Sequence, residues 1–306
     1  MKFTIKKILF ISLITLTNAF SQTNDYVAIL GTKCSILAPK DFLQSTSFSG
    51  LQNVEKSASI MINELPSSYF FMSENFTAEN LKSKGMILIS KESVDFNNSK
   101  ATYIKVSQNA NGMKYIKQLL MFGDENKTIL VNGIYPEKFK SLEDEIKISI
   151  FSTKYNENQN ENSLEAVDFE IDVTNTDFKY AKNFSGTIIY SIEGKMPTEK
   201  PIIMVGNSIS NVNPKDKRQY SIDRLKKLPN GESMTIESIN PITIDNIDGY
   251  EIIANGKNSK EEDEKIYQVM LYDETSGYYM IIGMASQEKE EYLKKFKEIA
   301  KSFHLK

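Results

Sequence analysis

Apolar and polar positions follow the same pattern in two places along the chain. Residues 117–122 read KQLLMF and residues 267–272 read YQVMLY, at an offset of 150 residues. At the same offset a second apolar run reaches Gly133 and Gly283, after the polar turns GDENK and DETSG. Two strand-forming runs joined by turn residues are typical of a β-hairpin. The pattern therefore predicts the same hairpin twice.

A helix with one apolar face is predicted after each hairpin. Large apolar residues recur there at spacings of three and four, which places them on one side of a helix. They are Phe139, Leu142 and Ile146 in the first copy, and Tyr292, Phe296, Ile299 and Phe303 in the second. Each helix can lay this apolar face on a sheet.

A shorter helix is predicted earlier in each copy. Thr77 and Ser221 are expected as its N-caps, because a hydroxyl there accepts a hydrogen bond from the first turn. An aromatic residue precedes each cap and a leucine follows in the helix, as in a hydrophobic staple. These pairs are Phe76 with Leu81 and Tyr220 with Leu225. The tripeptide FSG also occurs twice, at residues 48–50 and 184–186.

The order of elements predicts an α+β fold with two tandem copies of an antiparallel sheet flanked by helices, because strands come mostly in runs and helices are few. One stretch, residues 154–166 (KYNENQNENSLEA), is rich in Asn and Glu and poor in apolar residues. Such a composition is typical of a linker. We therefore expect a first domain at 22–153, a linker at 154–166 and a second domain at 167–306.

This order resembles the PsbP-like fold. The resemblance rests on APKDF near the start, on QLLMFGDENKTILVNG, and on QVMLYDETSGYYMIIGMAS with the helix after it. The second copy reads TNTDF where the first has its proline, so its opening strand departs from the pattern. The resemblance implies a tandem duplication of an accessory or binding domain, often exported, rather than an enzyme. It carries over no catalytic residue, since a fold does not fix a function.

The first 21 residues predict a bacterial secretory signal peptide. Three lysines precede the uncharged run ILFISLITLT, and small residues follow at Ala19 and Ser21. Cleavage is expected after Ser21. The run is too short for a comfortable membrane span, although an N-terminal anchor is the alternative. The only cysteine, Cys34, follows a lysine and lies far beyond the run, which argues against a lipoprotein. The sequence thus predicts a periplasmic or secreted protein without an integral membrane segment after cleavage.

Charge narrows the choice of partners. Residues 1–21 carry three lysines and no acid, so their removal changes the net charge of the chain from −3 to −6. Nucleic-acid binding needs a basic surface, and this composition predicts none. With one cysteine the chain cannot form an internal disulfide, and Cys34 is expected as a small buried hydrophobic residue.

Candidate chemistry is sparse. The only histidine, His304, lies near the C-terminus, and one His with one Cys cannot supply a usual zinc site, so no cofactor and no catalytic residue are expected. Ser286 and Lys289 form one S-x-x-K, but the serine is expected as a helix N-cap. Acidic residues that are weak candidates for ligand or calcium contact, with solvated turns as the alternative, are Asp245, Asp248, Glu262 and Asp263. Tyr278 and Tyr279 alternate on one strand, so one of them is expected to be exposed.

These observations favour an exported, non-catalytic accessory or binding protein of the bacterial cell envelope. Its partner would be an envelope protein or a small ligand. One alternative is a small-ligand or lipid carrier, which would require an apolar cavity between sheet and helix. Another is a carboxylate-dependent hydrolase, which would require a pocket with two carboxylates of raised pKa.

Overall fold

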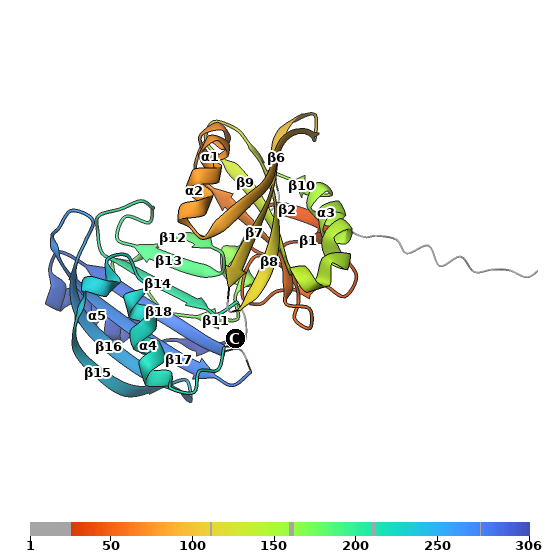
Figure 1. Ribbon diagram of the computed structural model, residues 1–306. Coiled ribbons are helices and arrows are strands. Elements are labelled where there is room, and N and C mark those ends of the chain that lie inside the picture. Colours follow the sequence, from red (N-terminus) through yellow and green to blue (C-terminus); the bar gives the residue numbers. More distant parts are fainter. Residues whose placement is uncertain (1–25, 111, 159–161, 210–211, 276) are drawn as a thin grey trace, which may run out of the picture.

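The computed structural model describes residues 26–110, 112–158, 162–209, 212–275 and 277–306. The predicted signal peptide, residues 1–21, lies outside the described residues. Two seven-stranded antiparallel sheets dominate the described chain, one in each half, and helices lie on their faces (Figure 1). The prediction of an α+β fold with two tandem sheet copies is confirmed.

The first sheet has the strand order β3-β4-β5-β9-β8-β7-β6. Its strands are β3 (Leu43–Gln44), β4 (Gly50–Asn53), β5 (Ala58–Leu65), β6 (Met86–Phe96), β7 (Ser99–Ala110), β8 (Met113–Gly123) and β9 (Thr128–Pro136). Helices α1 (Tyr69–Asn75) and α2 (Ala78–Ser83) cover one face, and η1 (Glu137–Leu142) and α3 (Glu143–Phe151) cover the other. A small sheet of β1 (Tyr26–Ala28), β2 (Cys34–Leu37) and β10 (Lys154–Tyr155) completes this domain.

The second sheet repeats this plan with the order β12-β13-β14-β18-β17-β16-β15. Its strands are β12 (Lys179–Phe184), β13 (Thr187–Ser191), β14 (Ile202–Asn207), β15 (Thr235–Ile244), β16 (Ile247–Lys257), β17 (Asp263–Asp273) and β18 (Gly277–Ala285). Helix α4 (Lys217–Lys226) packs on one face and α5 (Lys289–Lys301) on the other. The remaining elements are η2 (Ser163–Ala166), η3 (Gly231–Ser233) and the paired strands β11 (Phe169–Glu170) and β19 (His304–Leu305).

A glycine in each copy lets the last helix approach the sheet. A Cβ added to Gly133 would lie 2.3 Å from Ile146 Cγ2, and one added to Gly283 would lie 2.3 Å from Phe296 Cγ. Both members of the second pair lie 150 residues after those of the first. The repeated glycine and the helix packing on it confirm that α3 and α5 lie on the sheets. The predicted helix bounds are wrong in part: Phe139 and Leu142 lie in η1, where Phe139 has non-helical backbone angles, and Phe303 follows the end of α5.

The register of the first hairpin strand differs from the sequence alignment. Gln118 pairs with Gly133, but Tyr267 pairs with Gly283, so β8 and β17 correspond at an offset of 149 rather than 150. The cause is one additional residue in the second hairpin, because Gly283 lies 16 positions after its partner Tyr267, whereas Gly133 lies 15 positions after Gln118. Alternate residues of a strand point to opposite faces. Gln118 therefore donates to the Glu143 carbonyl beside α3, whereas Gln268 faces α4, so the predicted match of these two glutamines is wrong.

Two of the three predicted helix caps are wrong. Thr77 caps α2 as expected, accepting a hydrogen bond from the amide of Asn80 at 3.2 Å. Helix α4 instead begins after Asp216, five residues before the predicted cap, and Ser221 lies inside it. The last helix begins after Glu288, so Ser286 is not its cap and accepts a hydrogen bond from Asn258 instead. The carboxylate of Asp216 caps α4 by accepting a hydrogen bond from the amide of Gln219. The hydrophobic-staple pattern does not point to this residue.

The predicted linker contains regular structure at both ends. Lys154 and Tyr155 form β10, which pairs with β2 of the first domain, and Ser163–Ala166 forms η2. The Tyr155 ring packs on the hydrophobic core of the first domain. The sequence does not indicate this contact, because the residues around Tyr155 are mostly Asn and Glu.

Burial agrees with one expectation and corrects another. Cys34 is fully buried, as predicted. Tyr278 and Tyr279 do point to opposite faces, but both are buried, so the prediction that one is exposed is wrong. The reason is that α4 covers one face of this sheet and α5 covers the other.

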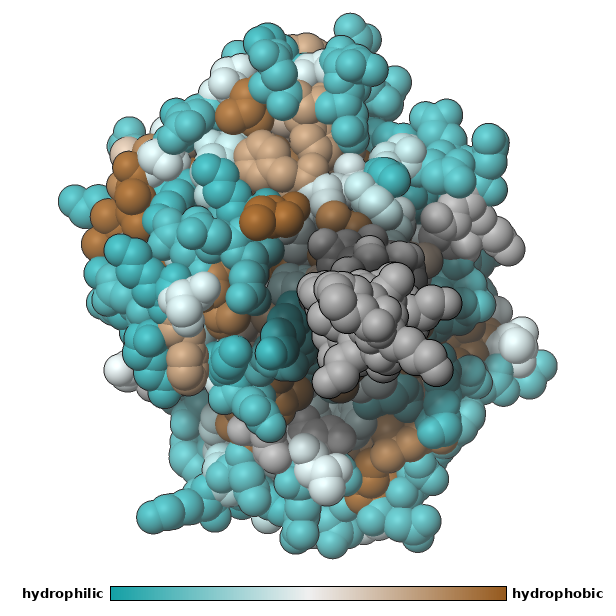
Figure 2. All heavy atoms as spheres, turned by 90° about the vertical axis from the view of Figure 1, so that its right-hand side faces the viewer, coloured by the Kyte–Doolittle hydropathy of each residue, from teal (hydrophilic) through white to brown (hydrophobic). Residues whose placement is uncertain are grey.

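The surface is largely polar. Figure 2 shows one side of the molecule, on which hydrophobic residues form separate groups among hydrophilic ones. The most exposed aromatic pair is Phe70 and Phe71 on α1, with 61% and 62% of their surface accessible. Within the described ranges, no helix combines the length and apolar character needed to cross a membrane.

Candidate functional site

The two domains contact each other through short reciprocal loops. The amide of Ser185, in the turn between β12 and β13, donates to Asn63 Oδ1 on β5 at 2.9 Å. In the other direction, Asn207 Nδ2 on β14 donates to Ser47 Oγ, in the loop between β3 and β4, at 2.9 Å. Gly186 lies directly on this loop, since an added Cβ would stand 1.8 Å from the Ser47 carbonyl oxygen. Both FSG tripeptides therefore lie at or next to the domain interface.

A cavity of about 340 Å³ lies beside this contact, and both domains line it. Its size falls at the lower end of the range for small-ligand sites. The first domain contributes residues from the β1–β2 turn, from the β3–β4 loop, from β5 and its continuation and from the β8–β9 turn. The second contributes its edge strand β12. The lining residues are Gly31, Thr32, Ser49, Ile62, Asn63, Glu64, Leu65, Pro66, Asn126, Lys127, Tyr180, Ala181, Lys182, Asn183 and Ser185.

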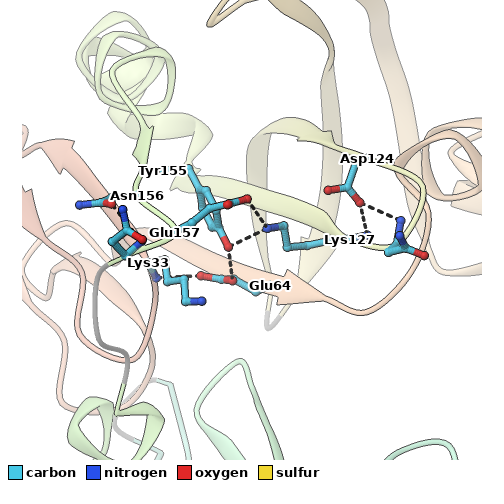
Figure 3. A network of polar contacts seen from close by, with 9 residues as sticks. Lys33, Glu64, Asp124, Lys127, Tyr155, Asn156 and Glu157 are labelled. Atoms are coloured by element: carbon cyan, nitrogen blue, oxygen red, sulfur yellow. Dashed lines mark hydrogen bonds and ion pairs between the residues drawn. The ribbon is translucent and has the colours of Figure 1, made fainter.

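A chain of polar contacts fixes one wall of the cavity (Figure 3). Lys127 Nζ donates to the Tyr155 hydroxyl at 2.8 Å and lies 4.1 Å from the centre of its ring. The hydroxyl in turn donates to Glu64 Oε2 at 3.5 Å, and Glu64 Oε1 accepts the amide of Lys33 at 2.8 Å. Strand β10, which carries Tyr155, thus connects the cavity wall to the small sheet.

The same network keeps Lys127 charged. Burial by itself lowers the pKa of Lys127, but the hydrogen bond to Tyr155 and the nearby charges of Glu157 and Asp124 outweigh it, so the pKa is raised. Burial raises the pKa of Tyr155, despite the ammonium beside it. Hydrogen bonds, first from the amide of Asn126 and then from that of Lys127, lower the pKa of Asp124. The wall therefore offers a protonated lysine held in place at neutral pH.

A second acidic group lies at the domain interface. Asp168 Oδ2 accepts a hydrogen bond from the Tyr279 hydroxyl at 3.3 Å, and Thr46 of the first domain also hydrogen-bonds to this carboxyl group. Oδ1 is buried and has no hydrogen-bond partner among the described residues. Burial raises the pKa of Asp168, although its hydrogen bonds and the charge of Lys306 act against this.

Asp168→Asn is expected to raise Tm at pH 7 by about 2–4 °C, because a neutral amide is cheaper to bury than an incompletely paired carboxylate. The folded pKa is above the ordinary value of 3.8, so the contribution of Asp168 to stability is present below that value and is lost as the pH rises through the folded pKa. The gain should therefore shrink as the pH falls towards 3.8. Thermal unfolding between pH 3.5 and 8 measures it.

Asp172→Asn is the matched control. Hydrogen bonds from Thr174 lower the pKa of this exposed carboxyl group, so its contribution is present above pH 3.8 and is lost as the pH falls. The two variants should show opposite trends with pH. Parallel trends would contradict the assignment of the stability change to Asp168.

The structure does not bring the predicted acidic candidates together. Asp245 and Asp248 lie at the β15–β16 turn, where they accept hydrogen bonds from the Leu305 amide and the Thr243 hydroxyl. Glu262 and Asp263 lie at the β16–β17 turn, at the opposite end of β16, and contact Asn258 and Lys257. The described residues contain no group of three or more His, Cys, Asp or Glu side chains that could hold a metal ion. A calcium contact by either pair stays a prediction.

Sequence reasoning did not find the cavity residues. They come from five segments separated by up to about 150 positions, and none of these segments contains a recognisable binding motif. The sequence signal closest to the cavity is the FSG tripeptide, whose serines, Ser49 and Ser185, both line it, but as a repeat this tripeptide predicts duplication rather than a site.

Comparisons with known proteins give no family. No family model matches the sequence, and a search of curated proteins finds no match. Similar solved structures include the Tle4–Tli4 complex (10% identity, 92% of this chain and 97% of that chain, TM-score 0.34). They also include LpqN, involved in cell envelope biogenesis of Mycobacterium tuberculosis (13% identity, 43% of this chain and 78% of that chain, TM-score 0.33). A third is the cyanobacterial PsbP of Synechocystis (12% identity, 43% of this chain and 92% of that chain, TM-score 0.31). Likenesses this low support no functional argument, and the PsbP-like interpretation stays a prediction.

Proposed function

We propose that this protein is an exported, non-catalytic binding protein of the bacterial cell envelope that holds a small ligand between its two domains. The observation that carries the proposal is the cavity of about 340 Å³ to which both domains contribute polar side chains. A site shared by two domains can respond to its ligand through their relative position. The export step rests on the predicted signal peptide.

The two alternative functions fit this cavity less well. A carboxylate-dependent hydrolase needs two carboxyl groups in one site, and Glu64 is the one carboxylate among the lining residues. A lipid carrier needs an apolar cavity between sheet and helix. This cavity lies between domains, and most of its lining residues carry charged, amide or hydroxyl side chains.

Docking of an envelope protein is a second candidate. It is favoured by Phe70 and Phe71, since exposed aromatic side chains are frequent anchors of protein interfaces. The two candidates differ in what travels with the protein: a small molecule in the first case and a protein of defined stoichiometry in the second.

Native mass spectrometry of the mature protein, purified gently from its own cells, tests the proposal. A small-molecule adduct is expected, and Ala181→Phe should remove most of it, at least about tenfold, because the new ring would fill the cavity. Ala181 lies at a register shift of β12, where the ladder is already interrupted. Val54→Phe, at an exposed residue outside the cavity, is the control. An adduct that survives Ala181→Phe, or a bare protein, would contradict a ligand in this cavity.

A further inference from the structure

The cavity between the domains has a charge opposite to that of the chain. Its lining contains Lys127 and Lys182 but only one acidic residue, Glu64, which gives the lining itself a balance of +1. The exposed carboxylate of Glu157, outside the lining, forms an ion pair with Lys127 at 3.7 Å, so Lys182 is the ammonium without an ion pair within the described residues. The mature chain is expected to carry −6. A positive patch in an acidic protein concentrates anions, because field lines focus in a recess with low-dielectric walls.

The hydrogen-bonding groups of the cavity are mostly donors. Asn63 uses Oδ1 to accept from Ser185, and its Nδ2 group donates to no partner within the described residues. The side-chain amide of Asn126 and the Lys182 ammonium likewise show no hydrogen bond there. Glu64, the acidic residue, already accepts the Lys33 amide and the Tyr155 hydroxyl. A ligand would thus find more donors than acceptors.

The two lysines come from different domains and are held differently. Tyr155 holds Lys127 in place, because Lys127 Nζ lies 2.8 Å from the Tyr155 hydroxyl and 4.1 Å from the centre of its ring. Lys182 lies on the edge strand β12, and its Nζ lies 5.6 Å from the centre of the Phe184 ring. One ammonium is therefore preorganised, and the other can turn towards a bound group without breaking an ion pair.

We infer that the ligand is a small anion with a carboxylate or phosphate group, bound between Lys127 of the first domain and Lys182 of the second, with the Asn63 amide donating to it. This inference rests on the proposed function and names the class of ligand. Charge-assisted hydrogen bonds from both ammonium groups to the anion would join the domains across the cavity.

Isothermal titration of the full mature protein with succinate, inorganic phosphate and methyl N-acetylglucosaminide tests the inference. We expect at least one of the two anions to bind, and to bind more weakly as salt is added. Lys182→Gln should weaken this binding about tenfold or more, since it removes a charged hydrogen-bond donor. Lys179→Gln is the matched control, because it removes an exposed lysine of the same strand that does not line the cavity. It should change the affinity less than about twofold.

The outcomes separate the class of ligand from the binding function. Equal effects of the two lysine variants would overturn the site, and no anion binding at millimolar concentration would overturn the inference. Binding of the neutral saccharide alone, blocked by Ala181→Phe and unchanged by Lys182→Gln, would overturn the anion class while supporting a ligand cavity. Vesicles with and without phosphatidylglycerol separate a lipid phosphate from a free one, and binding of either kind that depends on Lys182 would support the inference.

Discussion

Gly283→Ala is expected to lower the free energy of unfolding of the second domain by about 3 kcal/mol. The new Cβ would lie 2.3–2.6 Å from three ring atoms of Phe296, far inside contact distance. Phe296 is fully buried between α5 and the sheet, so its ring has no free space to move into. The helix would have to lift from β18, which loosens the whole of this core.

Urea unfolding followed by far-UV circular dichroism measures the effect. Gly256→Ala, in the same domain, is the control: its Cβ would meet the flexible Met234 side chain at 2.9 Å, and a cost below about 1 kcal/mol is expected. Combining Gly283→Ala with Phe296→Leu should cost clearly less than the two changes added together, because the smaller side chain relieves the clash. Additive costs would show that the glycine does not act through Phe296.

The equivalent change in the first copy should also be destabilising. A Cβ at Gly133 would meet the methyl groups Ile146 Cγ2 and Ile150 Cδ1, at 2.3 and 2.8 Å. The Cδ1 end of Ile150 can rotate to another rotamer, but Cγ2 of Ile146 is attached to Cβ, and χ1 of an isoleucine is nearly fixed in a helix. The two copies thus use one architectural device.

The sequence was sufficient for the fold because the relevant signals are local. Strand runs, turn residues and the apolar periodicity of the last helices each depend on a few neighbouring positions, and they recur at Gly133 and Gly283. The register of β8 and β17 was not recoverable in this way. A hairpin lengthened by one residue reverses which side chains face the core, and the coincidence of Gln118 and Gln268 in the sequence alignment masks the shift.

The candidate site was not predictable for a different reason. Its residues are brought together by the domain contact. Ser185 and Asn63, one of the pairs that make this contact, are 122 residues apart in the sequence. Sequence alone identifies acidic residues that lie close together along the chain, and in this protein those residues lie in the two turns that flank β16. A local cluster of acidic residues in the sequence does not show which residues from distant segments meet in the folded protein.

Gly186→Ala is expected to separate the two domains and so to open the cavity. The backbone of Gly186 has φ +82°, a conformation that costs a residue with a Cβ about 1–2 kcal/mol. The new Cβ would also stand 1.8 Å from the Ser47 carbonyl oxygen, which belongs to the backbone of the other domain. Relief of this overlap requires the domains to move apart, and the hydrogen bond between Ser185 and Asn63 would break.

Hydrogen exchange at the Ser185 amide, with small-angle X-ray scattering for the overall dimensions, measures the separation. We expect exchange at Ser185 to become at least about tenfold faster and the radius of gyration to increase, while both domains stay folded. Gly194→Ala is the control: its φ of +64° imposes a similar strain, but the nearest atom, Lys179 Cβ at 3.2 Å, belongs to the same domain. Unchanged protection of Ser185 in Gly186→Ala would contradict the contact on which the cavity depends.

The consequence for binding follows from the geometry. Lys127 and Lys182 reach one ligand only if the interface holds the β8–β9 turn and β12 next to each other. Gly186→Ala should therefore weaken anion binding as much as Lys182→Gln does, without changing a lining side chain, whereas Gly194→Ala should leave it within about twofold of the native value. Loss of binding in the first variant and not in the second would show that the domain contact, rather than either domain alone, makes the site.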